Sequence, residues 1–196
     1  MFKKIISKVI VFSLKLKGVN IDTNAIILKF PTLKIRGNPK NIKIGKVQIM
    51  GEIDLRIREN GKIEIEDGCK IEKDCRLVSA RDGVIKISEN STITIGAIIN
   101  GGSDVIIGKN CVLGPRAIIN ANDHKFEGKE LIKNQGYIHK KVVIEDDCWF
   151  GANVVVNKGV IIKKGSVVGA CSLVTKDTEE YSINFGVPSK KIKSRL

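Results

Sequence analysis

The chain has 196 residues, of which 42% are apolar, 5% aromatic and 28% charged, and its formal net charge is +13. This length and composition are typical of a single soluble globular domain and exclude a disordered chain. The positive charge fits nucleic acid, an anionic membrane or an anionic small molecule. Because the sequence has no zinc-finger or helix-turn-helix signature, we do not expect it to bind nucleic acid.

Residues 1–18, MFKKIISKVIVFSLKLKG, predict an amphipathic helix. On a helix its apolar residues gather on one side, with the lysines mostly elsewhere. The apolar run is interrupted by lysines and is too short to span a bilayer. Two hypotheses stay open: the helix caps the open end of the repeat structure described next, or residues 2–17 rest on the inner face of a membrane. The predicted apolar side consists of Phe2, Ile5, Ile6, Val9, Ile10 and Leu14.

A bulky apolar residue occurs at every sixth position from Ile144 onwards. Six residues per side and three sides per coil describe a parallel β-helix, a solenoid with a triangular cross-section. We therefore predict an all-β fold, with the parallel β-helix over residues 19–182 and a short basic tail over residues 183–196. The anchors of the regular part are Ile144, Phe150, Val156, Ile162, Val168 and Val174.

An earlier run has the same period, and residues 19–62 are expected to form irregular early rungs leading into it. Its clear anchors are Ile65, Ile71, Leu77, Ile95, Ile107, Leu113 and Ile119, and its weaker ones are Gly83, Glu89 and Gly101. Positive φ at the turns between faces accounts for glycine or asparagine at set offsets from the anchors. These turn residues are Gly151, Asn153, Gly159, Gly165 and Gly169.

Four of the five cysteines fall on the small interior position of their hexads. The fifth, Cys171, lies one position off it, and the sequence has no CxxC pair. We therefore expect the cysteines to pack in the core and to hold neither a metal nor a disulfide framework. The four interior cysteines are Cys69, Cys75, Cys111 and Cys148.

The hexads are interrupted once. The spacing from Ile119 to Ile144 exceeds four whole hexads by one position, and the segment 125–141, KFEGKELIKNQGYIHKK, is polar and aperiodic. We interpret it as a loop that leaves the coil. Loops on a rigid scaffold often carry binding and catalytic groups.

The only two histidines, His124 and His139, border this loop. His124 ends the last regular rung and is the candidate general base, because an imidazole can accept a proton near neutral pH. His139 is expected to face solvent inside the loop. No GxSxG elbow, P-loop or dinucleotide fingerprint is present. A base without a nucleophile indicates direct group transfer.

Several motifs together resemble the hexapeptide-repeat acyltransferases, above all the maltose, galactoside and polysaccharide O-acetyltransferases. They are the hexads, the loop after an NDH string, the segment CWFGANVVVNKGVIIKKGSVVGACSLVTKD and the terminal FGVPSKKI, within residues 83–196. The resemblance implies a left-handed coil, a homotrimer with active sites between neighbouring subunits, and acetyl-CoA as the acyl donor.

The resemblance also implies roles for individual residues, with His124 as the general base. Glycine at Gly101 or Gly102 stands where galactoside enzymes have an acidic acceptor contact, which leaves the identity of the acceptor open. The candidates for acceptor binding are Asn100 and Asn122. The group that orients His124 stays open between a backbone carbonyl and Asp123. The implied cofactor contacts are Trp149, Ala152, Ala170, Thr175, Lys176, Lys190 and Lys193. The two alanines would contribute backbone groups, and Lys190 and Lys193 would bind the cofactor phosphates.

These observations predict an acetyl-CoA-dependent O-acetyltransferase without a metal. Its acceptor is expected to be a sugar of a bacterial surface polysaccharide, and the protein is expected in the cytoplasm or at the inner face of the membrane. One alternative is N-acetylation of a nucleotide-linked amino sugar. Another, from a different class, is a β-helix scaffold without catalysis.

Overall fold

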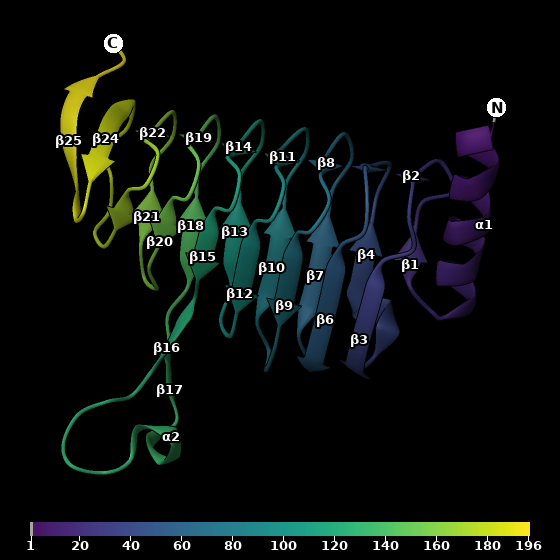
Figure 1. Cartoon of the computed structure of the whole chain (residues 1–196), viewed down its shortest axis with the longest axis horizontal. Coiled ribbons are helices and arrows are strands. Elements are labelled where there is room, and N and C mark those ends of the chain that lie inside the picture. The colour runs from purple at the N-terminus through teal and green to yellow at the C-terminus, as the bar shows by residue number, and fades with distance from the viewer. Residues whose placement is uncertain (1) are drawn as a thin grey trace.

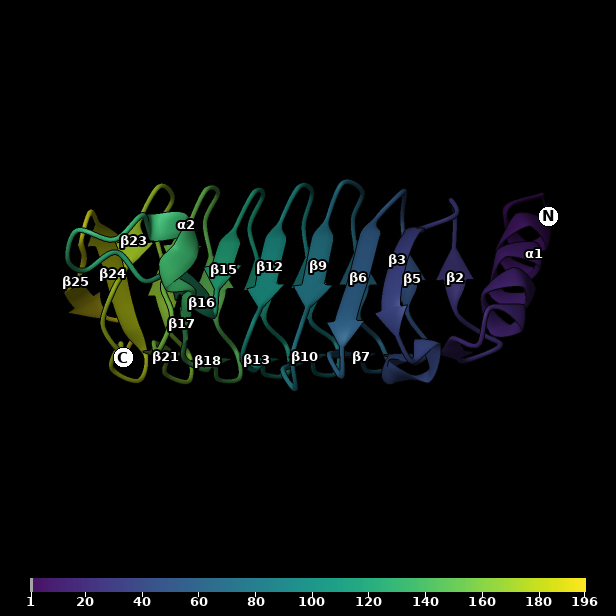
Figure 2. The same cartoon turned by 90° about the horizontal axis from the view of Figure 1, so that it is seen from below.

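The computed structural model describes residues 2–196, so the first residue of the predicted helix lies outside the described part. The chain winds into a three-sided column whose sides are three parallel sheets, here called sheets A, B and C (Figure 1 and Figure 2). Helix α1 (Phe2–Leu16) lies at one end, and a C-terminal hairpin lies at the other. The predicted all-β, three-sided parallel β-helix with an N-terminal helix and an inserted loop is confirmed.

Successive strands visit the three sheets in turn. Sheet A contains β1 (Asn20–Ile21), β4 (Ile42–Ile44), β7 (Lys62–Ile65), β10 (Val84–Ile87), β13 (Val105–Ile107), β18 (Val142–Ile144) and β21 (Ile161–Ile162). Sheet B contains β2 (Ile26–Ile27), β5 (Gln48–Ile49), β8 (Lys70–Ile71), β11 (Thr92–Ile93), β14 (Val112–Leu113), β19 (Trp149–Phe150), β22 (Val167–Val168), β24 (Ser182–Gly186) and β25 (Ser189–Ser194). Sheet C contains β3 (Thr32–Gly37), β6 (Asp54–Glu59), β9 (Arg76–Ser79), β12 (Ile98–Gly101), β15 (Ile118–Asn120), β20 (Val155–Val156) and β23 (Leu173–Val174). The remaining elements are η1 (Pro39–Asn41), β16 (Asn122–His124), α2 (Ile132–Gln135) and β17 (Tyr137–His139).

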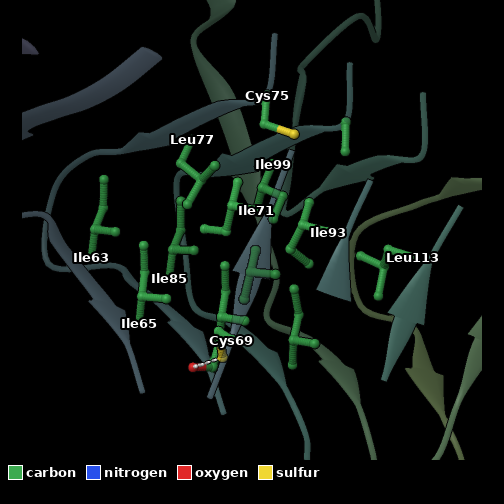
Figure 3. Packing of buried hydrophobic residues seen from close by; sticks show 14 of the residues in the cluster. Ile63, Ile65, Cys69, Ile71, Cys75, Leu77, Ile85, Ile93, Ile99 and Leu113 are labelled. Carbon is green, nitrogen blue, oxygen red and sulfur yellow. Dashed lines mark hydrogen bonds between the residues drawn. The ribbon is translucent and has the colours of Figure 1, made fainter. Parts of the chain in front are cut away.

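The interior of the column is a stack of aliphatic side chains, because alternate residues of each strand point inward (Figure 3). All predicted anchors from Ile144 to Val174 are buried. The four interior cysteines are buried as predicted, whereas Cys171 is exposed. Burial raises the pKa of Cys69 and of Cys75 to about 11, which keeps both as neutral thiols at neutral pH.

The early register differs from the predicted one. Phe150 pairs with Val168 after a coil of three hexads, whereas the coils that pair Ile71 with Ile93 and Ile93 with Leu113 are longer. Corners longer than those of a three-hexad coil, such as residues 80–83 between β9 and β10, move the inward positions out of the predicted hexad phase. The inward positions return to this phase at Ile107. The inward side chains of this stretch include Ile87, Ile93 and Ile99. The predicted anchors Glu89 and Ile95 are wrong, because Glu89 is exposed and Ile95 is only half-buried, whereas Gly83 and Gly101 are buried. Residues 19–62 are also more regular than predicted, since they supply β1 to β6 of the same sheets.

Three of the predicted turn residues, Asn153, Gly159 and Gly165, have positive φ values of 56°, 81° and 69°. Gly151 and Gly169 do not, so the reason predicted for them is wrong. They accommodate close approach of the next coil: a Cβ on Gly151 would lie 2.6 Å from the backbone nitrogen of Ala170, and one on Gly169 would lie 1.9 Å from the Phe185 ring.

Helix α1 lies across the open end of the column (Figure 1). Its buried residues include Ile10 and Leu14, and the Ser7 hydroxyl donates to the carbonyl of Ala25 and accepts from the amide of Ile27. The helix therefore caps the first coil. The predicted single apolar side divides in two, because the opposite face of α1 exposes Phe2, Ile5, Val9, Phe12 and Leu16.

The predicted C-terminal tail is an ordered hairpin. Strand β24 extends sheet B beside β22 in parallel, and β25 returns antiparallel to it. The Arg195 guanidinium donates to the carbonyl of Gly165 at 2.7 Å and pairs with Asp147 at 3.1 Å. This hairpin covers the last coil, as α1 covers the first.

Candidate active site

An arm formed by residues 122–140 projects from the column (Figure 1). Ile144 pairs with Ile107 on one side and with Ile162 on the other, and the chain between Ile107 and Ile144 is about twice as long as a regular coil. The predicted excursion at residues 125–141 therefore exists, but the chain leaves the coil earlier, at Asn122. As a result both histidines belong to the arm itself.

The base of the arm is the antiparallel pair β16 and β17. Its register places His124 opposite Tyr137 and Asn122 opposite His139. Because side chains alternate along a strand, these four residues share one face of the arm. The ring centroids of His124 and Tyr137 are 4.2 Å apart, and those of Tyr137 and His139 are 6.0 Å apart. The His124 ring is exposed and therefore accessible to a substrate.

Asp123 lies on the other face of the arm. Its carboxylate accepts a hydrogen bond from the ammonium group of Lys158 in the next coil. This ion pair engages the Asp123 carboxylate and ties the arm to the column. Within residues 2–196 the His124 imidazole makes no hydrogen bond, and its close neighbour is the Tyr137 ring.

A hollow of about 520 Å³ lies between the face of the arm and the outer side of sheet C. Three of the predicted residues, His124, Asn100 and Asn122, line it together. The Asn100 amide donates to the side-chain oxygen of Asn120 on the next coil at 2.8 Å. The hollow thus combines an accessible imidazole with side-chain amides, which are groups suited to binding sugar hydroxyls.

His139 is half-buried and lines the same hollow, so the prediction that it faces solvent is wrong. Its Nδ1 atom is buried and has no hydrogen-bond partner within the described residues. Burial lowers the pKa of His139, Arg81 lowers it further, and Glu59 acts in the opposite direction. A Cβ on Gly102 would lie 2.5 Å from the His139 Nδ1 atom, so a glycine at this position admits the ring.

Two predicted cofactor residues, Ala152 and Ala170, occupy the same corner of consecutive coils. The amide of Cys171 donates to the carbonyl of Ala152 at 2.8 Å. Within residues 2–196 the amides of both alanines donate no hydrogen bond. Trp149 stands on the outer side of sheet B, beside Val112 and Val167, and is 53% exposed.

Lys176 and Lys190 line a second hollow, of about 250 Å³, near the C-terminal hairpin. Thr175 and Lys193 are exposed but do not line it. None of the predicted cofactor residues lines the hollow that contains His124. Within one copy of the chain, the candidate base and the candidate cofactor residues therefore do not share a hollow.

Within residues 2–196, no cluster of three or more histidine, cysteine, aspartate or glutamate side chains could hold a metal ion. In the same residues, no helix has the length and hydropathy needed to cross a membrane.

The stacked hexads and the histidine-bearing arm define a hexapeptide-repeat β-helix protein. Two segments match models of such repeats: residues 141–176 match the bacterial transferase hexapeptide (six repeats), and residues 104–120 match the hexapeptide repeat of succinyl-transferase. The predicted resemblance to the hexapeptide-repeat acyltransferases is confirmed.

The chain is similar to galactoside O-acetyltransferase from Lactococcus lactis, with 41% identity over 86 residues that make up 44% of this chain and 41% of that protein. It therefore spans about two fifths of the length of that relative. Among solved structures it is similar to the polySia specific acetyltransferase NeuO, with a TM-score of 0.73 and 26% identity over 90% of this chain and 80% of NeuO. It is also similar to a hexapeptide-repeat acetyltransferase from Vibrio cholerae complexed with acetyl-CoA, with a TM-score of 0.54 and 28% identity over 65% of this chain and 70% of that one.

Proposed function

We propose that the protein is an acetyl-CoA-dependent O-acetyltransferase that modifies a sugar hydroxyl of a bacterial surface polysaccharide. The observation that carries this proposal is the exposed His124 imidazole beside the amide-lined hollow. Similarity to a galactoside O-acetyltransferase and to the polySia specific acetyltransferase supports a saccharide hydroxyl as the acceptor.

In the proposed reaction His124 removes the proton of the acceptor hydroxyl while the oxygen attacks the thioester carbonyl of acetyl-CoA. The resulting oxyanion is stabilised by a backbone amide, for which the amide of Ala152 is the candidate. Collapse of this intermediate breaks the carbon–sulfur bond. The CoA sulfur then takes the proton from the imidazolium, so that His124 returns to its starting state.

The assembly that completes this site is a homotrimer with active sites between subunits. The separation of His124 from the lysine-lined hollow within one chain supports a site that two copies share. In such a trimer His124 of one copy faces the corner with Ala152 and Ala170 on a neighbour, whose Lys176 and Lys190 bind the cofactor phosphates.

The proposed location is the cytoplasm, with α1 resting on the inner face of the membrane. The exposed apolar stripe of α1 includes Phe12, which is 65% exposed, and Val9, which is 57% exposed. Lysines beside this stripe complement anionic lipid headgroups. Because α1 lies across the end of the column, the column would stand upright on the membrane (Figure 1).

The test is transfer of radiolabelled acetyl from acetyl-CoA to matched hydroxyl sugars and amino sugars. We expect ester formation with the hydroxyl sugars, and a fall in kcat of about 10²- to 10⁴-fold in His124→Ala with acetyl-CoA binding retained. Lys125→Ala, also at the base of the arm, is the matched control and keeps its activity. Transfer to amines alone would support the N-acetyltransferase alternative, and absence of transfer and of acetyl-CoA binding would support the scaffold.

A further inference from the structure

A cluster of cations covers the outer side of sheet C toward the N-terminal end. In the sheet register Lys34 pairs with Arg56, and Arg36 pairs with Arg58. These side chains point outward, because the residues that alternate with Arg56 and Arg58 on β6, Leu55 and Ile57, are buried. We call this surface the basic strip; it consists of Lys34, Arg36, Arg56, Arg58, Arg76 and Arg81.

The basic strip is continuous with the hollow that contains His124. Arg58, Arg76 and Arg81 line that hollow, and Arg58 also lines an adjoining one of about 140 Å³. The other residues of the adjoining hollow are Lys34, Arg36 and Arg56. From β15 beside the arm to β3 there are four strand spacings, which is about 19 Å. The strands follow one another along this face in Figure 2.

Few carboxylates balance these charges. Asp54 pairs with Arg56, whose Nε donates to it at 2.8 Å, and this hydrogen bond holds the pKa of Asp54 below its usual range. Asp54 itself lines neither hollow, and the carboxylates that line the hollow with His124 are Glu59 and Asp123, of which Asp123 pairs with Lys158. Within residues 2–196 the other five cations of the strip form no ion pair, and the Nε of Arg76 is buried without a hydrogen-bond partner.

Sheet A shows that this imbalance is not a general property of the lysine-rich surface. Its outer side pairs Lys43 with Glu64 at 2.9 Å and Lys86 with Glu66 at 2.7 Å. Lys109 and Glu89, at the following corner, are 3.0 Å apart. The same coils therefore neutralise their lysines on one side and leave mostly arginines without acidic partners on another. Arginine is the side chain best suited to bidentate binding of carboxylate and phosphate groups.

We propose that the basic strip binds the acceptor, which is an extended polyanionic saccharide with carboxylate or phosphate groups on successive sugars. The saccharide lies along sheet C, with one sugar at His124 and the preceding ones over β9, β6 and β3. This inference rests on the proposed function, and it assigns a substrate class to the same site. Between β3 and β9 the strip has no aromatic side chain on which nucleic-acid bases could stack, which favours a saccharide over single-stranded nucleic acid.

The first experiment measures binding alone, by fluorescence anisotropy with labelled hexagalacturonate, poly(glycerol phosphate) and the neutral maltohexaose. The protein is the full chain carrying His124→Ala, so that binding is independent of catalysis. We expect both anionic probes to bind, with affinity that falls as salt rises, and maltohexaose to bind at least tenfold more weakly. Preference between the anionic probes identifies the charged group.

The variants Arg36→Ala and Arg58→Ala, each added to this background, should weaken binding of the anionic probes about tenfold, the contribution of one charge-assisted contact. Lys43→Ala and Lys86→Ala on sheet A are the matched controls and should leave it unchanged. Equal losses in the sheet A variants, tighter binding of maltohexaose, or tighter binding of a single-stranded oligonucleotide would each overturn the proposal.

The second experiment tests the inference about the basic strip independently of the proposed function. With His124 intact, Arg36→Ala should raise the KM for the anionic acceptor and leave the KM for acetyl-CoA unchanged. If the parent transfers acetyl to neutral sugars as efficiently as to anionic ones, the inference about the strip fails while the transferase stands. If the anionic probes bind but no acetyl is transferred to any acceptor, the proposed function fails and the strip remains an anion-binding surface.

Discussion

His124 and Tyr137 face each other across the base of the arm, with their ring centroids 4.2 Å apart and their planes inclined by 40°. Within residues 2–196 the His124 imidazole makes no hydrogen bond, and the Tyr137 ring is its close neighbour. The relationship indicates that Tyr137 is a positioning residue for the proposed base.

Removal of the Tyr137 ring should therefore lower kcat and leave the KM for acetyl-CoA unchanged. We expect Tyr137→Ala to reduce kcat by about tenfold to a hundredfold, because a general base acts efficiently only when it is correctly placed. Tyr137→Phe keeps the ring and should retain most of the activity. The measurement is steady-state kinetics with thermal unfolding as a control, and equal loss in both variants would assign the effect to the hydroxyl instead.

Mixing two inactive variants should restore activity if the site lies between copies. One variant is His124→Ala, and the other is the double variant Lys176→Ala with Lys190→Ala. After unfolding and refolding at equal amounts, about a quarter of the sites should combine an intact histidine with intact lysines. Activity and mass by light scattering are measured on the same sample. If the mixture is trimeric and no activity is recovered, His124 and the two lysines belong to a site within one chain.

Acid should destabilise the folded protein partly through His139. Its pKa is lowered in the folded state, mainly by burial, so the unfolded chain binds the proton more readily. Stability therefore rises with pH through the interval between the lowered pKa and the ordinary value of about 6.5, and it is lost as pH falls through that interval. Urea midpoints at pH 7.5 and pH 5.5 measure this effect, and it should be smaller in His139→Asn. A pH dependence of the same size in the variant would contradict this role of His139.

The exposed stripe of α1 should bind anionic membranes without contributing to the fold. Phe12→Ser should reduce co-sedimentation with vesicles that contain anionic lipid and leave the melting temperature within about 1–2 °C of the parent, because the side chain is 65% exposed. Ile10→Ser is the contrasting variant. Its side chain is buried against the coil, so the melting temperature itself should fall. Unchanged sedimentation of Phe12→Ser, with self-association of the parent through this face, would identify a second copy as the occupant.

Much of the fold followed from local pattern. The period of six from Ile144 to Val174 predicted the three-sided coil, because each position of a solenoid repeats the environment of the one a coil earlier. The same logic identified the buried cysteines. It failed between Leu77 and Ile107, where corners of different length shift the phase while the apolar content stays the same.

The candidate site was accessible to sequence only in part. The break in the hexads pointed to His124, and resemblance pointed to Asn100 and Asn122, which the structure brings into one hollow with it. The role of Tyr137 and the burial of His139 depend on the antiparallel register of the arm, and a polar aperiodic segment carries no periodic signal from which that register could be read.

The sequence by itself determined the architecture of this protein, since a repeated hexad buries its apolar residues in only one way, by stacking coil on coil. Tertiary structure decided where charge and chemistry meet. Arg36 and Arg58 are separated by a full coil of the chain and become neighbours only when their coils stack. Long-range pairing therefore creates the basic strip and its continuity with His124, which no local pattern of residues records.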